Sequence, residues 1–195
     1  DDLPFDHQEG TCASSNEIVL LCFDTHDSRQ CRRASSPHGP WAEMTPSTFN
    51  HRWTFSLATS QGYLCWFFNL NWAYSKDGFL TVGSRGPDGF NNIKTELFDF
   101  GTNTWETMDD YPYGSTDSKG FGYYDMVYMQ ESSAYYVIGG LSSPGEDSEH
   151  MHSTIAKFHN GVWSQAGQLN QSRHVSPRFL KPFKTPVLRH IELNG

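Results

Sequence analysis

The chain has 195 residues and a net charge of −8, and it is 15% aromatic but only 18% charged. Such a composition does not match that of disordered segments, which are charged and poor in aromatics, and it is typical of half-buried β-strands. The acidic balance argues against a nucleic-acid partner, which needs a cationic surface, and the longest apolar stretch, 64–74, is too short for membrane insertion.

Residues 1–16 are rich in acidic and polar side chains and contain no apolar signal segment, so we expect an irregular leader there. Beyond it, short stretches rich in β-branched and aromatic residues, bounded by turn-forming residues, predict strands. These stretches are 17–23, 53–58, 78–82, 94–100, 123–129, 135–138 and 154–158. Asn160-Gly161 predicts a tight hairpin, and no stretch shows the apolar period of a helix. The sequence therefore predicts an all-β protein with antiparallel strands.

Two stretches share one order of residues: a strand ending in glycine, a second strand with an aromatic residue, a turn and a tryptophan. The shared positions are Gly83, Phe98 and Trp105 in one stretch, and Gly139, Gly140, Phe158 and Trp163 in the other. A run at 18–31 looks like the second half of a third copy, with Cys31 where the other copies carry tryptophan. Repetition on this scale is typical of propellers and other arrays.

The half copy at 18–31 lies too far from the copy that contains Phe98 for the repeat to have an even period. The motif at 61–64 returns at 77–80, and removal of one intervening segment restores the spacing. We therefore interpret about 65–80 as an insertion. The alternative is a chance likeness inside a long surface loop.

This order of residues resembles the kelch repeat, in which two strands end at a Gly-Gly pair and are followed by a loop, an aromatic residue, a turn and a tryptophan. The best match is 135–163, with Phe158 in the place of the family's tyrosine, and the next is 79–105. The resemblance implies four-stranded antiparallel blades of a β-propeller. With about two clear units and one half unit, we expect an incomplete kelch-type propeller over 17–174. An irregular, proline-rich tail at 175–195 follows it.

The resemblance also implies a binding module that presents inter-strand loops, here 85–92 and 141–152, to a protein partner and has no catalysis of its own. Two alternatives stay open. One is a fragment of an enzyme of the kelch-propeller oxidase type, a family that uses copper with Tyr, His and Cys ligands. The other is a structural protein of an extracellular matrix or coat. We expect no catalytic residue, no cofactor and no metal site, because the chain contains no known catalytic motif.

Two groups of polar residues have the chemistry of a site. His150 and His152 would share one face of a strand, but no spacing fixes a third metal ligand, so we favour a solvated loop. Further possible ligands lie near them in sequence: Glu146, Asp147, Glu149 and His159. Asp109 and Asp110 would point to opposite faces of a strand and could not share a substrate, so we favour a solvated turn there.

Cysteine usage bears on both stability and location. Cys22 and Cys31 flank a polar, turn-like run, and this spacing can bring two strands together and permit a disulfide. The alternative is two free thiols. A bridge would favour a secreted protein, because disulfides persist in oxidising compartments. The sequence otherwise leaves the location open.

Overall fold

The computed structural model describes residues 11–14, 18–23, 27–36, 38–51, 73–74, 78–84, 92–114, 120–145 and 148–173. Within these residues the chain is all-β, with one short 3₁₀ turn, η1 (Gln130–Ser132). The predicted strands that fall in this part are present, within a few residues of their expected bounds. The predicted strand at 53–58 and the proline-rich tail at 175–195 lie outside the described residues.

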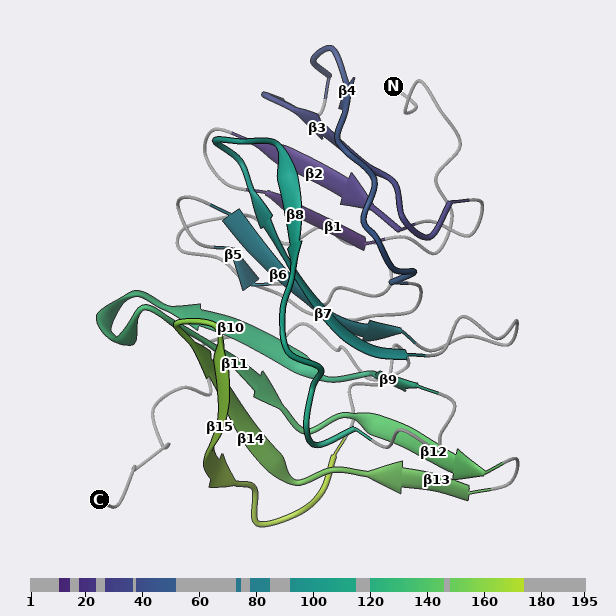
Figure 1. Ribbon diagram of the computed structural model, residues 1–195, viewed down its shortest axis with the longest axis vertical. Helices are drawn as coiled ribbons and strands as arrows, with labels where there is room; N and C mark the ends of the chain where they lie inside the picture. Colours follow the sequence, from purple (N-terminus) through teal and green to yellow (C-terminus); the bar gives the residue numbers. More distant parts are fainter. Residues whose placement is uncertain are drawn as a thin grey trace.

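Three four-stranded antiparallel sheets follow one another along the chain (Figure 1). The first sheet consists of β1 (Thr11–Ser14), β2 (Val19–Cys22), β3 (Cys31–Ala34) and β4 (Ala42–Glu43). The second consists of β5 (Ala73–Tyr74), β6 (Gly78–Ser84), β7 (Asn92–Asp99) and β8 (Thr104–Thr107). The third consists of β10 (Asp125–Met129), β11 (Ala134–Ile138), β14 (Thr154–His159) and β15 (Val162–Gln168).

A smaller, three-stranded sheet lies beside the third one. It consists of β9 (Phe121–Gly122), β12 (Leu141–Gly145) and β13 (Ser148–Met151), in the order β13-β12-β9. The β12–β13 hairpin is inserted between β11 and β14, at the position that the sequence predicted to be a loop. The hairpin projects from the lower part of the molecule, away from the outer strand β15 (Figure 1).

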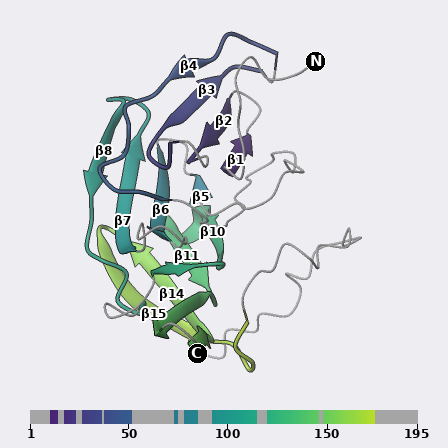
Figure 2. The same cartoon turned by 90° about the vertical axis from the view of Figure 1, so that its right-hand side faces the viewer.

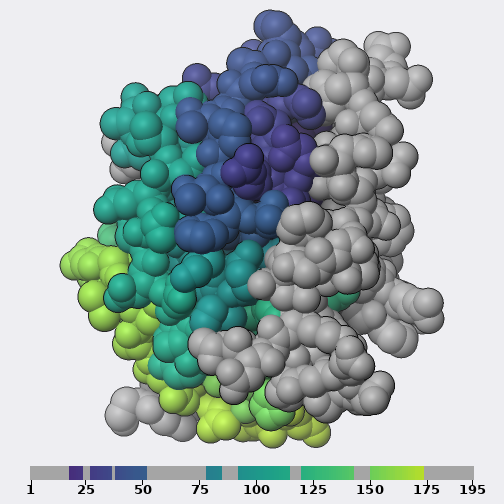
Figure 3. Space-filling view, turned by 45° about the vertical axis from the view of Figure 1, so that its right-hand side comes forward, coloured from purple at the N-terminus to yellow at the C-terminus, as the bar shows by residue number. Residues whose placement is uncertain are grey.

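The three main sheets stack in chain order. Their last strands β4, β8 and β15 lie along one side, and their first strands β1, β5 and β10 lie along the other (Figure 2). The space-filling view shows the sheets in contact from top to bottom (Figure 3). Strand β6 is buried along its whole length, because it lies inside the middle sheet of the stack. Phe79 and Phe98, paired across β6 and β7, stack with their ring centroids 5.3 Å apart at the centre of the core.

Strand register defines the repeat and corrects one part of the sequence interpretation. Phe98 lies opposite Trp105, and Phe158 lies opposite Trp163. In the first sheet, the pairing of Arg33 with Ala42 extends by one residue to place Trp41 opposite Ala34. Trp41, and not Cys31, therefore holds the tryptophan position, and the prediction for Cys31 was wrong. The first sheet is a whole four-stranded unit, because β1 and β4 complete the half unit seen at 18–31.

Within the repeat, Cys31 belongs to the strand that precedes the tryptophan-bearing strand. The amide of Met44 donates to the carbonyl of Cys31, and the amide of Met108 donates to the carbonyl of Thr95, both at 2.9 Å. Cys31 thus occupies the position of Thr95. The sequence alignment slipped by one strand because the first copy carries neither the glycine nor the aromatic residue that mark the other two copies.

A left-handed residue ends the second strand of each main sheet. Gly83 and Gly139 both have φ of 68°, and Phe23 has φ of 58° at the equivalent place. An added Cβ would lie 2.5 Å from the Phe121 carbonyl oxygen at Gly83 and 2.5 Å from the Arg173 carbonyl oxygen at Gly139. Glycine is therefore required at these two sites both by backbone conformation and by close approach of the chain.

The structure also bears on the predicted leader, the predicted insertion and the predicted hairpin turn. Strand β1 lies inside the segment 1–16 that was expected to be irregular. Within the predicted insertion at 65–80, residues 73–74 form β5 and residues 78–80 begin β6, so these parts belong to the second sheet; the rest lies outside the described residues. The Asn160-Gly161 turn is confirmed, with φ of 51° and 79° as a two-residue hairpin of the type I′ class requires.

Candidate functional site

The β12–β13 hairpin is fastened at its base by backbone hydrogen bonds. The His152 amide donates to the Gly140 carbonyl, and the Gly139 amide donates to the Thr154 carbonyl, each at 2.9 Å. On its inner side the hairpin pairs with β9, where Leu141 lies opposite Gly122. The hairpin is therefore an ordered extension of the third sheet, with both of its ends held close together.

Aromatic packing anchors the same base to the core. Phe121 is fully buried and stacks between Tyr111, at 4.3 Å, and Tyr124, at 5.0 Å between ring centroids. The ring of His152 meets Phe121 edge-on at 5.6 Å. The Ser142 hydroxyl lies 2.7 Å from His152 Nε2, which links β12 to the residue after β13. These contacts fix the direction in which the hairpin projects.

His152 is uncharged at neutral pH. Burial of the imidazole, together with the neighbouring His150, lowers the pKa of His152 to about 4. Among the described residues, no carboxylate hydrogen-bonds to His152, so its contact with Ser142 lacks the acidic partner of a catalytic triad. The arrangement fits a structural hydrogen bond at the root of the hairpin.

Near the base of the hairpin, two side chains of β13 are exposed. The side chain of Met151 is 45% exposed and that of His150 is also exposed. β13 is the outermost strand of its sheet, and no strand among the described residues pairs with its free edge. We call His150, Met151 and this edge of β13 the hairpin surface.

The two histidines considered as metal ligands lie together, and His159 does not lie with them. The rings of His150 and His152 are 4.8 Å apart. His159 lies at the other end of β14, with its Nδ1 3.1 Å from the Ser133 carbonyl oxygen. Glu146, Asp147 and the side chain of Glu149 lie outside the described residues. The part of the chain that is described contains no group of three or more His, Cys, Asp or Glu side chains placed to hold a metal ion.

The tryptophans of the repeat connect neighbouring sheets. Trp105 Nε1 donates to the Thr45 carbonyl at 2.6 Å, on the segment that leaves the first sheet. Trp163 Nε1 donates to the Asp109 carbonyl at 3.2 Å, on the segment that leaves the second sheet.

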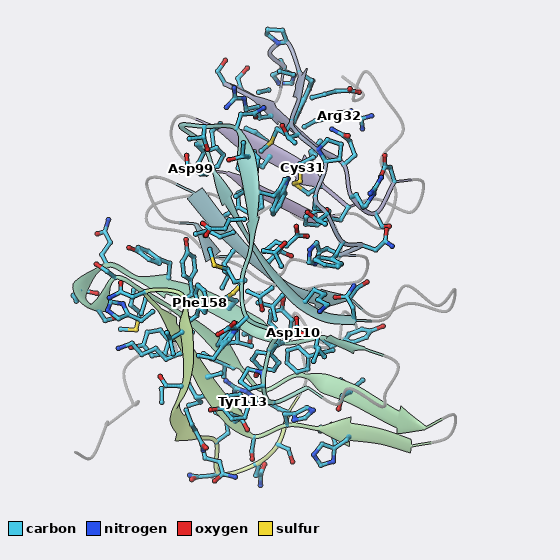
Figure 4. The ribbon with its side chains drawn as sticks, viewed as in Figure 1. Cys31, Arg32, Asp99, Asp110, Tyr113 and Phe158 are labelled. Carbon is cyan, nitrogen blue, oxygen red and sulfur yellow. A yellow bond between two sulfur atoms is a disulfide. The ribbon has the colours of Figure 1, made fainter. Side chains whose placement is uncertain are left out.

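The two carboxylates considered in the sequence, Asp109 and Asp110, lie on this segment. The backbone carbonyl of Asp109 accepts the hydrogen bond from Trp163. The exposed Asp110 carboxylate contacts Lys94 Nζ at 2.9 Å. Figure 4 shows Asp110 beside the third sheet that carries Phe158.

A buried pair of charged residues lies in the first of these joints, and sequence reasoning did not find it. His51 Nε2 lies 2.8 Å from Glu96 Oε2, and both side chains are fully buried. Glu96 also accepts the amides of Thr48, at 2.9 Å, and Phe49, at 3.0 Å. Burial alone would raise the pKa of Glu96, but the hydrogen bond and charge of His51 and the two amides together hold that pKa below its ordinary value. The pair ties the linker after the first sheet to β7.

The cysteine prediction is confirmed as a spatial pairing. Cys22 lies directly opposite Cys31 across β2 and β3, with their Cα atoms 4.0 Å apart and their sulfur atoms at disulfide distance. Both residues are fully buried on the side of the first sheet that faces the second.

Two loops were expected to meet a partner. Residues 85–91 of the first loop lie outside the described residues, whereas the second loop, 141–152, forms the hairpin.

Comparison with known proteins supports the fold only. No family model matches the chain, and no curated protein matches it. Among solved structures, one chain described as "Structure of YjhT" superposes with a TM-score of 0.61 at 12% sequence identity. The match covers 87% of this chain but 54% of that one, so this chain spans about half the length of its structural neighbour. The shared property is an all-β arrangement of successive antiparallel sheets.

The described residues include no helix that is long and apolar enough to cross a membrane.

Proposed function

We propose that the chain is a kelch-like binding module, whose four-stranded sheets are blades of an incomplete propeller and whose inter-strand loops meet a protein partner. It has no catalysis of its own. Three observations support the kelch-like part of the proposal. The sheets repeat in chain order, a left-handed residue ends the second strand of each, and a tryptophan joins consecutive sheets.

The observation that carries the binding function is the β12–β13 hairpin. The backbone bond from Gly139 to Thr154 already closes the connection between β11 and β14, so the residues beyond it are not needed to complete the third sheet. They instead form a paired projection, on which the described side chains of His150 and Met151 are exposed. A rigid projection loses little conformational entropy on binding, and this favours recognition.

The hairpin surface indicates the type of partner. The free edge of β13 presents backbone groups to which an extended peptide can add as a further strand. Exposed Met151 supplies an adaptable apolar contact, and His150 adds a hydrogen-bonding ring beside it. We therefore expect the partner to offer an extended segment with apolar side chains.

Peptide selection tests this proposal. A phage library of random peptides is panned against the chain, and selected peptides are then measured against Met151→Asp and against Val162→Asp. Val162 is the matched control, because it is 60% exposed and lies on the outer strand β15, which belongs to a different sheet from the hairpin. We expect Met151→Asp to weaken binding about tenfold or more, as a central interface contact does, and Val162→Asp to leave it unchanged. Selected peptides that bind Met151→Asp as tightly as the original chain would overturn the proposal.

A further inference from the structure

The chain contains one acceptor motif for an N-linked glycan, directly after the last strand of the third sheet. The motif is Asn170-Gln171-Ser172, in which serine follows asparagine two residues later and the residue between them is not proline. It occurs once among the 195 residues. The motif alone does not make a site, so its place in the fold decides whether it can carry a glycan.

The structure places the motif on a short bend whose two ends are held. Just before the motif, the Leu169 amide donates to the Ser153 carbonyl at 2.7 Å. Just after it, the Arg173 amide donates to the His152 carbonyl at 3.1 Å. The first two residues of the motif form the bend between these bonds, in the yellow loop at the bottom of Figure 1. The motif therefore lies on an outer loop and belongs to no strand.

The Asn170 side chain is exposed, as are those of the two residues that follow it. Among the described residues, none hydrogen-bonds to it. Other asparagines use their amide nitrogen inside the fold. The side-chain amide of Asn92 donates to the Asn50 carbonyl at 2.8 Å, and that of Asn103 donates to the Thr45 hydroxyl at 3.0 Å. An N-linked glycan is bulky and needs a surface acceptor, and the structure provides one at Asn170.

The cysteine pair indicates the compartment in which such a glycan is added. Cys22 and Cys31 have their sulfur atoms at disulfide distance, and disulfides form in the lumen of the endoplasmic reticulum and persist in secreted proteins. N-linked acceptor motifs are used in proteins of the same route. The pair lies in the first sheet and the motif follows the third, so the two features are independent and indicate one environment.

We propose that Asn170 carries an N-linked glycan. The co-substrate is an oligosaccharide joined through its C1 carbon to a lipid diphosphate. The Nδ2 nitrogen of Asn170 forms a bond to C1, the bond between C1 and the diphosphate oxygen breaks, and the lipid diphosphate leaves with that electron pair. The amide nitrogen gives up one proton, and no group is oxidised or reduced. This inference goes beyond the binding function and does not depend on the hairpin surface.

The first part of the test uses protein from its native source. Its peptides are analysed by mass spectrometry before and after treatment with peptide N-glycosidase, which releases the glycan and converts the acceptor asparagine to aspartate. We expect the peptide with Asn170 to carry N-acetylhexosamine and hexose units before treatment and aspartate at position 170 afterwards. An unmodified Asn170 in this protein overturns the proposal.

The second part assigns the modification to the motif. The chain is produced in cultured animal cells behind a cleavable secretion signal, together with three variants. Asn170→Gln and Ser172→Ala should lose the mass of the glycan completely, whereas Ser172→Thr should keep it, because threonine also satisfies the motif. Ser172→Ala leaves the acceptor in place, and Ser172→Thr is its matched control for folding and secretion. A glycan that persists in Ser172→Ala, or one that is lost in Ser172→Thr, overturns the assignment.

Discussion

Glu96 and His51 form a buried pair, with 2.8 Å between Glu96 Oε2 and His51 Nε2, although they lie 45 residues apart in sequence. His51 Nδ1 lies 2.8 Å from the Gly83 carbonyl oxygen, which can only accept, so Nδ1 carries a proton. Because two backbone amides favour the ionised form of Glu96, the pair holds an imidazolium against a carboxylate. Removal of one partner therefore leaves an uncompensated buried charge.

Glu96→Gln should lower the free energy of unfolding by about 3 kcal/mol at neutral pH, as the loss of one member of a buried pair does. The matched control is Asp110→Asn, which breaks the exposed contact with Lys94 and should cost about 1 kcal/mol or less. Urea denaturation of both variants measures the difference. Equal losses in the two variants would contradict a buried ion pair.

The same pair predicts a pH dependence. The pKa of Glu96 in the folded chain lies below its ordinary value, so its contribution to stability is complete above pH 4.5 and is lost as the pH falls through the folded pKa. Stability measured from pH 7 downward should therefore fall less steeply for Glu96→Gln than for the original chain. A parallel decline of the two curves would count against this assignment.

Phe23 predicts an unusual order of two substitutions. Phe23→Ala and Phe23→Gly both remove a buried ring, at a cost of about 3–5 kcal/mol. Because residue 23 has φ of 58°, glycine should be about 1 kcal/mol more stable than alanine there. At Phe98, which lies in the extended strand β7, we expect Phe98→Ala to be more stable than Phe98→Gly. Thermal unfolding of the four variants decides the question.

Substitution of two glycines with similar φ separates the stability cost of backbone conformation from the cost of steric crowding. Gly161→Ala meets nothing within 4 Å and should cost about 1 kcal/mol through its φ of 79° alone. Gly139→Ala, with φ of 68°, also places its Cβ 2.5 Å from the Arg173 carbonyl oxygen and should cost at least twice as much. Similar costs for the two variants in chemical denaturation would show that the chain after β15 does not approach Gly139 closely.

Two buried tyrosines should respond oppositely to loss of the hydroxyl. Tyr124 donates its hydroxyl to the Val82 carbonyl at 2.6 Å, whereas the Tyr111 hydroxyl has no hydrogen-bond partner among the described residues. Burial raises the pKa of both, so both hydroxyls are protonated. Tyr111→Phe should raise the free energy of unfolding by about 1 kcal/mol, and Tyr124→Phe should lower it by about 1 kcal/mol. A loss of stability in Tyr111→Phe would reveal a partner for its hydroxyl.

The cysteine pair predicts a sensitivity to reductant. Closure of a loop of about ten residues contributes about 2–3 kcal/mol in the chain-entropy model. Dithiothreitol should lower the unfolding free energy of the original chain by that amount and should have no effect on a Cys22→Ser/Cys31→Ser variant. Peptide mapping without reductant identifies the crosslinked peptide. Alkylation of both residues in protein from its native source would contradict the bridge.

The sequence predicted the inner strands well because they alternate or run apolar, as in β6 and β11. It missed strands β4 and β13, which lie at sheet edges and are largely polar, so they carry little periodic signal. The first copy of the repeat was misaligned for a related reason. Phe23 stands in the glycine position and Ala34 in the aromatic position, so only Trp41 marked the unit.

The candidate site was predicted only as a variable segment. The order Leu-Ser-Ser-Pro-Gly in β12 contains a proline and turn formers, which favour a loop, and only pairing with β9 and β13 makes it a strand. The buried pair of His51 and Glu96 left no signal, because His51 comes from the linker after the first sheet and Glu96 from β7 of the second. Interactions of this kind depend on how the sheets stack, and strand patterns do not report that stacking.

The closed base of the β12–β13 hairpin makes its outer part independent of the rest of the molecule. Because the bonds at Gly139 and Gly140 hold the two ends at a constant separation, residues can be added, lost or exchanged beyond them without moving β11 or β14. Natural variation and laboratory selection can therefore act on the hairpin while the sheets are preserved. The third unit can thus serve as a scaffold for displayed peptides.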